Sequence, residues 1–113
     1  MADVVYVDFN DGVKRVMNNA KLYVKLLAKF KADTNIEELS ANLAAGDLEK
    51  AQVQAHTIKG VAANLSLTEL FNQVLELENQ IKARSVDANQ TETVKTVFAS
   101  TMREVDKVIA EHG

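Results

Sequence analysis

One of the two histidines, His56, lies in a segment whose residue types suit chemistry on an anionic group. Lys59 follows three residues later, and on a helix this spacing places its ammonium group beside the imidazole ring. Helical side chains lean toward the N-terminus, so a side chain at position 60 would cover that ring. Position 60 is a glycine, although a glycine inside a helix costs roughly 0.5–1 kcal/mol relative to alanine. The three residues therefore predict an open imidazole beside a positive charge, which is a suitable site for an anion.

Each of these residues also has a purely structural interpretation. A single helical histidine is often an ordinary surface side chain, Lys59 can be simply solvated, and Gly60 can allow another helix to approach closely. A metal site is disfavoured, because a di-iron bundle needs a glutamate three residues before the histidine, where Val53 stands. The second histidine, His112, is the penultimate residue, and we expect it to be frayed and solvated.

The composition excludes several classes of function. The absence of cysteine excludes disulfides, thiolate catalysis and zinc sites with cysteine ligands. The four glycines form neither a dinucleotide-binding motif nor a phosphate loop, so any phosphoryl group must come from another protein. A net charge of -3, without aromatic residues in a basic patch, disfavours nucleic-acid binding. We expect no membrane span and no secretory signal, and hence a cytoplasmic protein. A helical dimerisation domain would need a long apolar a/d seam on an outer face, which the sequence lacks, so we expect a monomer.

The elements that must position His56 are predicted to be helices. The chain has no proline and only 4 glycines, too few for the turns of an antiparallel β-protein, and it is rich in good helix formers. We predict a single all-α domain over residues 1–113, an antiparallel four-helix bundle with an additional short N-terminal helix and an irregular arm at residues 4–7. The predicted helices begin after Asn10, at Asn19, at Asn35, at Asp47, at Ser66 and at Asn89.

Capping residues support these boundaries. Asn19, Asn35 and Asp47 are each suited to accept backbone hydrogen bonds at a helix start. Gly46 is suited to the left-handed conformation that follows a helix end. The segment 66–69 has the pattern of a capping box for the fifth helix, and Asn89 with Glu92 has a similar pattern for the last one.

Residues 55–65, Ala-His-Thr-Ile-Lys-Gly-Val-Ala-Ala-Asn-Leu, resemble the signature of the histidine-containing phosphotransfer (HPt) domain family. That signature is approximately Ala-His-x-Leu-Lys-Gly, followed by small residues, an apolar residue and a glycine. Three further segments resemble the family at matching spacings, namely residues 26–30, the pair Gly46-Asp47 and the pair Leu77-Glu78. Two positions depart from it: Ser66 stands where the family most often has glycine, which is expected to alter how the fifth helix begins, and Val61 could add bulk beside the site.

The resemblance implies a role for each site residue. His56 would accept a phosphoryl group on Nε2, Lys59 would offset charge on the phosphoryl oxygens, and Gly60 would leave the ring accessible. Glu78, at a position where the family has Glu or Gln, would accept the Nδ1 proton in a hydrogen bond and so orient the ring. The structural alternative for Glu78 is a helix-surface salt bridge with Lys82.

The resemblance also implies a function and a set of partners. The chain would be a phosphohistidine carrier in a two-component phosphorelay, passing a phosphoryl group between the aspartates of response-regulator receiver domains or from a sensor or hybrid histidine kinase. It would not be an enzyme with its own turnover and would bind no cofactor, because the receiver would supply Mg²⁺. The alternative is a helical interaction module that binds receivers without phosphotransfer. The contact with a receiver would be bordered by Val13, Val16, Met17, Gln52 and Ala63.

Overall fold

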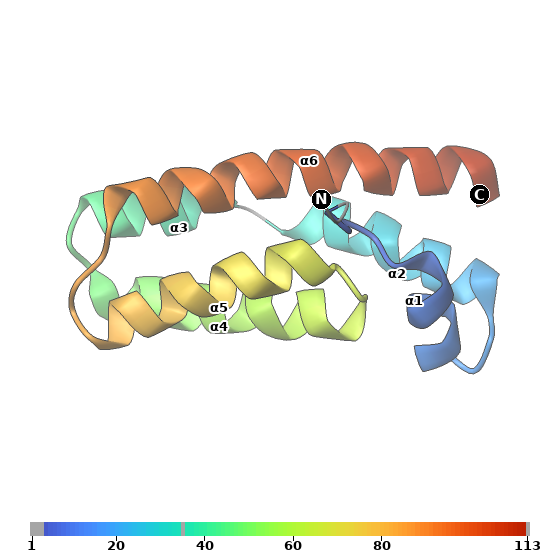
Figure 1. The fold of residues 1–113 in the computed structure, drawn as a ribbon, viewed down its shortest axis with the longest axis horizontal. Coiled ribbons are helices and arrows are strands. Elements are labelled where there is room, and N and C mark those ends of the chain that lie inside the picture. The colour runs from blue at the N-terminus through green and yellow to red at the C-terminus, as the bar shows by residue number, and fades with distance from the viewer. Residues whose placement is uncertain (1–3, 35, 113) are drawn as a thin grey trace.

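The structure, a computed structural model, describes residues 4–34 and 36–112, and within them the chain forms six helices and no strand (Figure 1). The all-α prediction is confirmed, and residues 4–7 form the irregular arm that the sequence predicted. The predicted cap at Asn35 lies outside the described residues. No helix in the described ranges is both long enough and apolar enough to cross a membrane. The helices are α1 (Phe9–Arg15), α2 (Ala20–Asp33), α3 (Ile36–Ala44), α4 (Leu48–Asn64), α5 (Thr68–Lys82) and α6 (Ala88–His112).

The bundle is organised around α6, which has 25 residues and runs along the whole length of the molecule (Figure 1). The helices α4 and α5 pair with each other along one half of α6, and α5 packs directly on α6. The short helix α3 closes this half by packing on α4 and α6. Along the other half, α2 packs on α6, and α1 packs on α2.

Small residues on α4 determine where His56 lies. Ala51, Ala55 and Ala62 are all fully buried, and their short side chains allow α5 to approach α4 closely. Each residue of an α-helix is rotated about 100° from the one before it. His56 follows Ala55 and therefore projects from the edge of the α4–α5 contact rather than into the core.

Several predicted helix ends are confirmed. The side chain of Asn19 accepts a hydrogen bond from the backbone N–H of Leu22, and Asp47 does the same for Lys50. Gly46 has a φ of 76°, so it ends α3 in the left-handed conformation that glycine adopts without strain. The end of α3 and the start of α4 are thus determined by residues close to them in the sequence.

The link between α4 and α5 differs from the prediction, because Ser66 does not cap α5. The N-cap of α5 is Leu67, which makes no side-chain capping bond. Ser66 instead has a φ of 57° directly after α4, and the next N–H, that of Leu67, donates to the carbonyl of Ala62. This pattern is typical of helices that end at a glycine. The Ser66 hydroxyl donates to Asp11 of α1, a partner that no local sequence pattern indicates.

Three other end predictions need correction. The helix α1 begins at Phe9 with Asp8 as its cap, slightly earlier than predicted. At the start of α6, Asp87 accepts the N–H of Asn89, so Asp87 is the residue that caps this helix rather than Asn89. His112 is not frayed, since it lies within α6 and its ring stacks on Phe9 with the ring centroids 4.2 Å apart.

The contact between α1 and α2 depends on a glycine that the sequence did not single out. A Cβ atom at Gly12 would lie 2.3 Å from ring atoms of Tyr23. The Tyr23 ring is fully buried, its hydroxyl donates to the carbonyl of Leu65 at 2.6 Å, and burial raises the pKa of this phenol. Because the ring is buried and hydrogen-bonded, the close approach of α1 requires glycine at position 12.

Candidate functional site

His56 presents an exposed and oriented imidazole on α4. Its side chain is 70% exposed, and its Nδ1 atom lies 3.1 Å from Oε2 of Glu78 on α5. An ionised carboxylate only accepts hydrogen bonds, so this contact assigns the ring proton to Nδ1. The other ring nitrogen, Nε2, then keeps its lone pair and is the nucleophilic atom of the ring.

Glu78 is a buried carboxylate rather than the surface residue of the structural alternative. It is 1% exposed, and its partners are His56, Lys59 and Lys82. Burial alone would raise the pKa of Glu78, but hydrogen bonds from Lys59 and His56 and the charges of Lys59 and Lys82 together lower it below its ordinary value. Glu78 is therefore ionised at neutral pH.

Lys59 contacts Glu78 as well as flanking the histidine. Its Nζ atom lies 2.5 Å from Oε1 of Glu78, and its side chain is only 20% exposed. The simple solvated interpretation of Lys59 is therefore wrong. In the free protein the ammonium group is bound to the carboxylate that orients His56.

Gly60 lies on the open surface of α4. A Cβ atom added there would meet nothing within 4 Å. No helix of the described chain approaches this position closely, so the close-packing interpretation of Gly60 is wrong for this chain. A longer side chain at position 60 would have free space in which to lean over His56.

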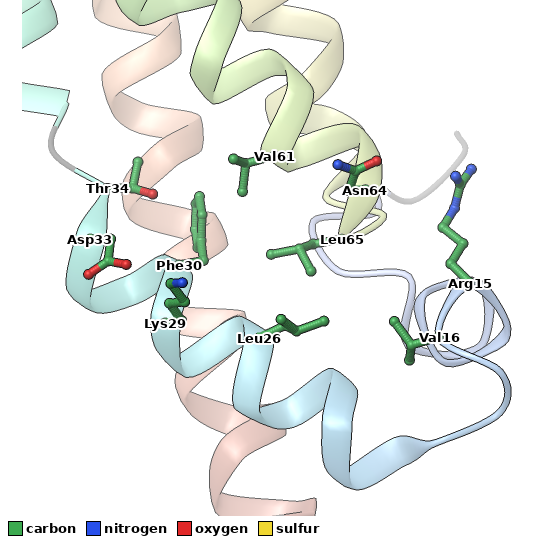
Figure 2. Close-up of a pocket in the computed structure, with 10 residues that line it drawn as sticks. All are labelled: Arg15, Val16, Leu26, Lys29, Phe30, Asp33, Thr34, Val61, Asn64 and Leu65. Atoms are coloured by element: carbon green, nitrogen blue, oxygen red, sulfur yellow. The ribbon is translucent and has the colours of Figure 1, made fainter.

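Two clefts that border α4 each have a volume of about 530 Å³. The first, which we call the histidine cleft, lies between α4 and α5 and is lined by His56, Glu78, Lys82 and Glu49 among others. The second, the apolar groove, lies between α1, α2 and α4, and Figure 2 shows its apolar side chains pointing toward one another. Its apolar lining consists of Val16, Leu26, Phe30, Val61 and Leu65. Val61 thus lines the apolar groove and is absent from the lining of the histidine cleft.

The remaining predicted contact residues do not share one surface: Ala63 lines a smaller cleft between α1, α4 and α5, and Val13 is partly buried against the core. Val16 lines the apolar groove and Gln52 lines the histidine cleft. Met17 is 92% exposed in the turn between α1 and α2. Within residues 4–34 and 36–112, no cluster of three or more histidine or acidic side chains could hold a metal ion.

Comparison with protein families identifies the family of this chain. The model of the family described as the Hpt domain matches residues 26–108. The chain belongs to the Hpt domain family. Hpt domains carry out histidine phosphotransfer in phosphorelays, and they are phosphocarrier modules rather than catalysts. No significant match was found among curated proteins or among solved structures.

Family membership gives the geometry a functional context. The matched segment of this Hpt domain contains His56, Lys59, Gly60 and Glu78, which the fold brings to one edge of the α4–α5 pair. The sequence did not assign a function to Lys82, although it is four residues after Glu78 and so lies on the same side of α5. Gly12, outside the matched segment, also went unnoticed because its partner Tyr23 lies on the next helix.

Proposed function

We propose that this Hpt domain carries a phosphoryl group on Nε2 of His56 and exchanges it with the aspartate of a receiver domain. The observation that carries the proposal is the contact between Nδ1 of an exposed imidazole and a buried, ionised carboxylate. This arrangement fixes the tautomer whose Nε2 is nucleophilic and aims that atom away from the bundle.

The transfer itself requires no base from this chain. The Nε2 lone pair attacks the phosphorus atom of an aspartyl phosphate, and the bond between phosphorus and the aspartate oxygen breaks. The electron pair of that bond leaves with the aspartate carboxylate, while the imidazole ring becomes positively charged. Glu78 stabilises this charge through the hydrogen bond to Nδ1. The reverse reaction returns the electron pair to Nε2, so the same geometry supports accepting and donating.

Other residues of the site have supporting roles in this proposal. Gly60 admits the partner to the ring because it leaves the neighbouring turn of α4 uncovered. The family resemblance would have Lys59 offset the negative charge of the transferring group, but its ammonium group is paired with Glu78, so its contribution to this proposal is to hold that carboxylate. We expect any Mg²⁺ that the transfer needs to be bound by the receiver.

We propose receiver domains and a histidine kinase as partners, with the apolar groove as part of the receiver contact. The residues of α4 that line the groove, from Val61 onward, begin five residues after His56, a rise of about 8 Å along the helix. The same five residues turn about 140° around α4, so a partner that covers His56 must also extend around the helix to reach the groove. Arg15 and Lys29 also line it, and these cations suit a partner whose active site is acidic.

A helical interaction module without phosphotransfer is the second candidate. It explains the apolar groove equally well, because a groove requires only a bound partner. It gives no reason for an open glycine beside an oriented imidazole. The two candidates are separated by chemistry at His56 and not by binding.

The experiment is incubation of the full chain with a phosphorylated receiver, followed by a search for acid-labile label. We expect one labelled site in the wild type and none in His56→Gln. Because His56 is largely exposed, this variant should melt at nearly the wild-type temperature. Label that persists in the folded His56→Gln protein would overturn the proposal, and receiver binding without any label would favour the interaction module.

A further inference from the structure

The ion pairs around Glu78 involve two lysines that are held very differently. Lys59 lies 2.5 Å from Oε1 and is mostly buried, whereas Lys82 lies 3.7 Å from Oε2 and is 52% exposed. A separation of 3.7 Å is too long for a hydrogen bond. Oε2 already accepts the hydrogen bond from His56, so it keeps a partner if Lys82 moves away. Lys82 can therefore leave Glu78 at low cost, and Lys59 cannot.

The two lysines also differ in their position relative to the histidine cleft. Lys82 lines the histidine cleft together with His56, and Lys59 is absent from that lining. The cleft is the open volume beside the imidazole, where a phosphoryl group on the ring would find room. Of the charged residues that line it, Glu49 and Glu78 are acidic and Lys82 is the cation.

Charge balance shows why a mobile cation is needed. A phosphoryl group brings close to two negative charges to the site, and the positive charge that the phosphorylated ring acquires offsets only one of them. The nearest cation, Lys59, is committed to Oε1 and already compensates the charge of Glu78. Without a second cation the phosphorylated site would hold an excess of negative charge next to Glu49 and Glu78.

We propose that Lys82 is the cation that binds the phosphoryl oxygens, and that Lys59 is a positioning residue that holds Glu78 against His56. This assignment rests on the proposed phosphorylation of His56. It reassigns the charge-offsetting role that the family resemblance gave to Lys59. The long side chain of Lys82 would move from Oε2 toward the cleft when the phosphoryl group arrives.

The test compares Lys82→Met and Lys59→Met with a matched control, Lys107→Met. Lys107 is an exposed lysine on α6 that pairs with Glu104, far from the histidine cleft. Each full-length variant receives the phosphoryl group from a phosphorylated receiver, and the rates of transfer in both directions are measured. The nitrogen chemical shifts of the unphosphorylated His56 ring report its tautomer and orientation.

We expect Lys82→Met to slow transfer roughly tenfold, the usual effect of losing one charge-assisted hydrogen bond at a partly exposed site. The ring shifts of this variant should equal those of the wild type, Lys82→Arg should restore most of the rate, and Lys107→Met should have no effect. Lys59→Met should shift the ring signals and lower the melting temperature, because Glu78 loses its closest partner.

Two results would overturn the assignment. One is a wild-type transfer rate in Lys82→Met, and the other is slow transfer in Lys59→Met with unchanged ring signals, which would make Lys59 the phosphoryl-binding residue. Failure of the underlying function looks different, because the wild type itself would then carry no label on His56.

Discussion

Two helical glycines of this chain have opposite surroundings. At Gly12 the space for a side chain is filled by the ring of Tyr23, and at Gly60 that space is empty to at least 4 Å. Near Gly12, polar groups form hydrogen bonds within the protein: the Tyr23 hydroxyl donates to the carbonyl of Leu65, and the Ser66 hydroxyl donates to Asp11. The region around Gly60 leaves an imidazole 70% exposed.

The difference separates two reasons for tolerating glycine in a helix. Both positions give up some helical stability relative to alanine. At Gly12 this loss is offset by the close packing of α1 on α2, so glycine serves the fold. At Gly60 no packing offsets it, which agrees with the proposal that this glycine gives a partner access to His56.

The largest expected effect is on transfer in Gly60→Gln. The added side chain should lean over His56 and obstruct the partner, which should slow phosphotransfer by roughly 100-fold, the cost of misplacing reacting groups by about 1 Å. Stability should be unchanged or higher by up to ~1 kcal/mol. Transfer assays and thermal melts measure the two effects, with Ala99→Gln at an exposed position of α6 as the control. A large decrease in the melting temperature of Gly60→Gln would show that Gly60, like Gly12, is needed for packing.

The second effect is on stability in Gly12→Ala. The new methyl group would overlap a ring that is buried and hydrogen-bonded, so we expect a loss of ~1–3 kcal/mol. For a domain of this size, each kcal/mol lowers the melting temperature by about 4–8 °C. Transfer at a temperature where the variant is folded should remain near the wild-type rate. An unchanged melting temperature would mean that α1 packs less tightly on α2 than the structure shows.

The third prediction concerns the pH dependence of stability that arises from the buried carboxylate of Glu78, which contacts His56. The pKa of Glu78 in the folded protein lies below its ordinary value of 4.5, so its ionised form stabilises the fold above that pH. This contribution is lost as the pH falls through the folded-state pKa. The melting temperature of the wild type relative to Glu78→Gln should therefore decrease as the pH is lowered from about 5 to about 3. A difference that stays constant over this range would contradict the ion-pair network around Glu78.

The smallest effect is expected at Ser66, in the packed region. Ser66→Gly would remove the conformational strain of a left-handed backbone at a residue with a side chain, but it would also lose the hydrogen bond to Asp11. Because these two effects oppose each other, we expect the free energy of unfolding to change by less than ~1 kcal/mol. Ser66→Ala loses the same bond and keeps the backbone strain. It should thus be the less stable variant in chemical denaturation, and equal stabilities would show that the backbone at this position carries no strain.

The sequence predicted what depends on neighbouring residues. Helix ends at Asn19, Gly46 and Asp47 were correct because each capping interaction involves residues close in the chain. The pairing of His56 with Glu78 agrees with the family resemblance, and periodicity supports it by placing both residues at the α4–α5 edge.

What the sequence missed depends on partners far along the chain. Ser66 bonds to Asp11, 55 residues away, and its backbone ends α4 instead of capping α5. The stacking of His112 on Phe9 joins opposite ends of the described chain. The attachment of Lys59 to Glu78 depends on how closely α4 and α5 approach, which spacing alone does not determine.

The N-terminal arm has a consequence for the extent of the folding unit. The family match begins at residue 26, yet Val5 accepts the N–H of Glu69, Asp8 donates its N–H to Ser66, and Tyr23 is fully buried. A protein trimmed to the matched segment would lose these bonds and expose the end of α4. The segment that matches the family is therefore shorter than the packed unit of this protein, and domain boundaries drawn for expression should retain residues 4–25.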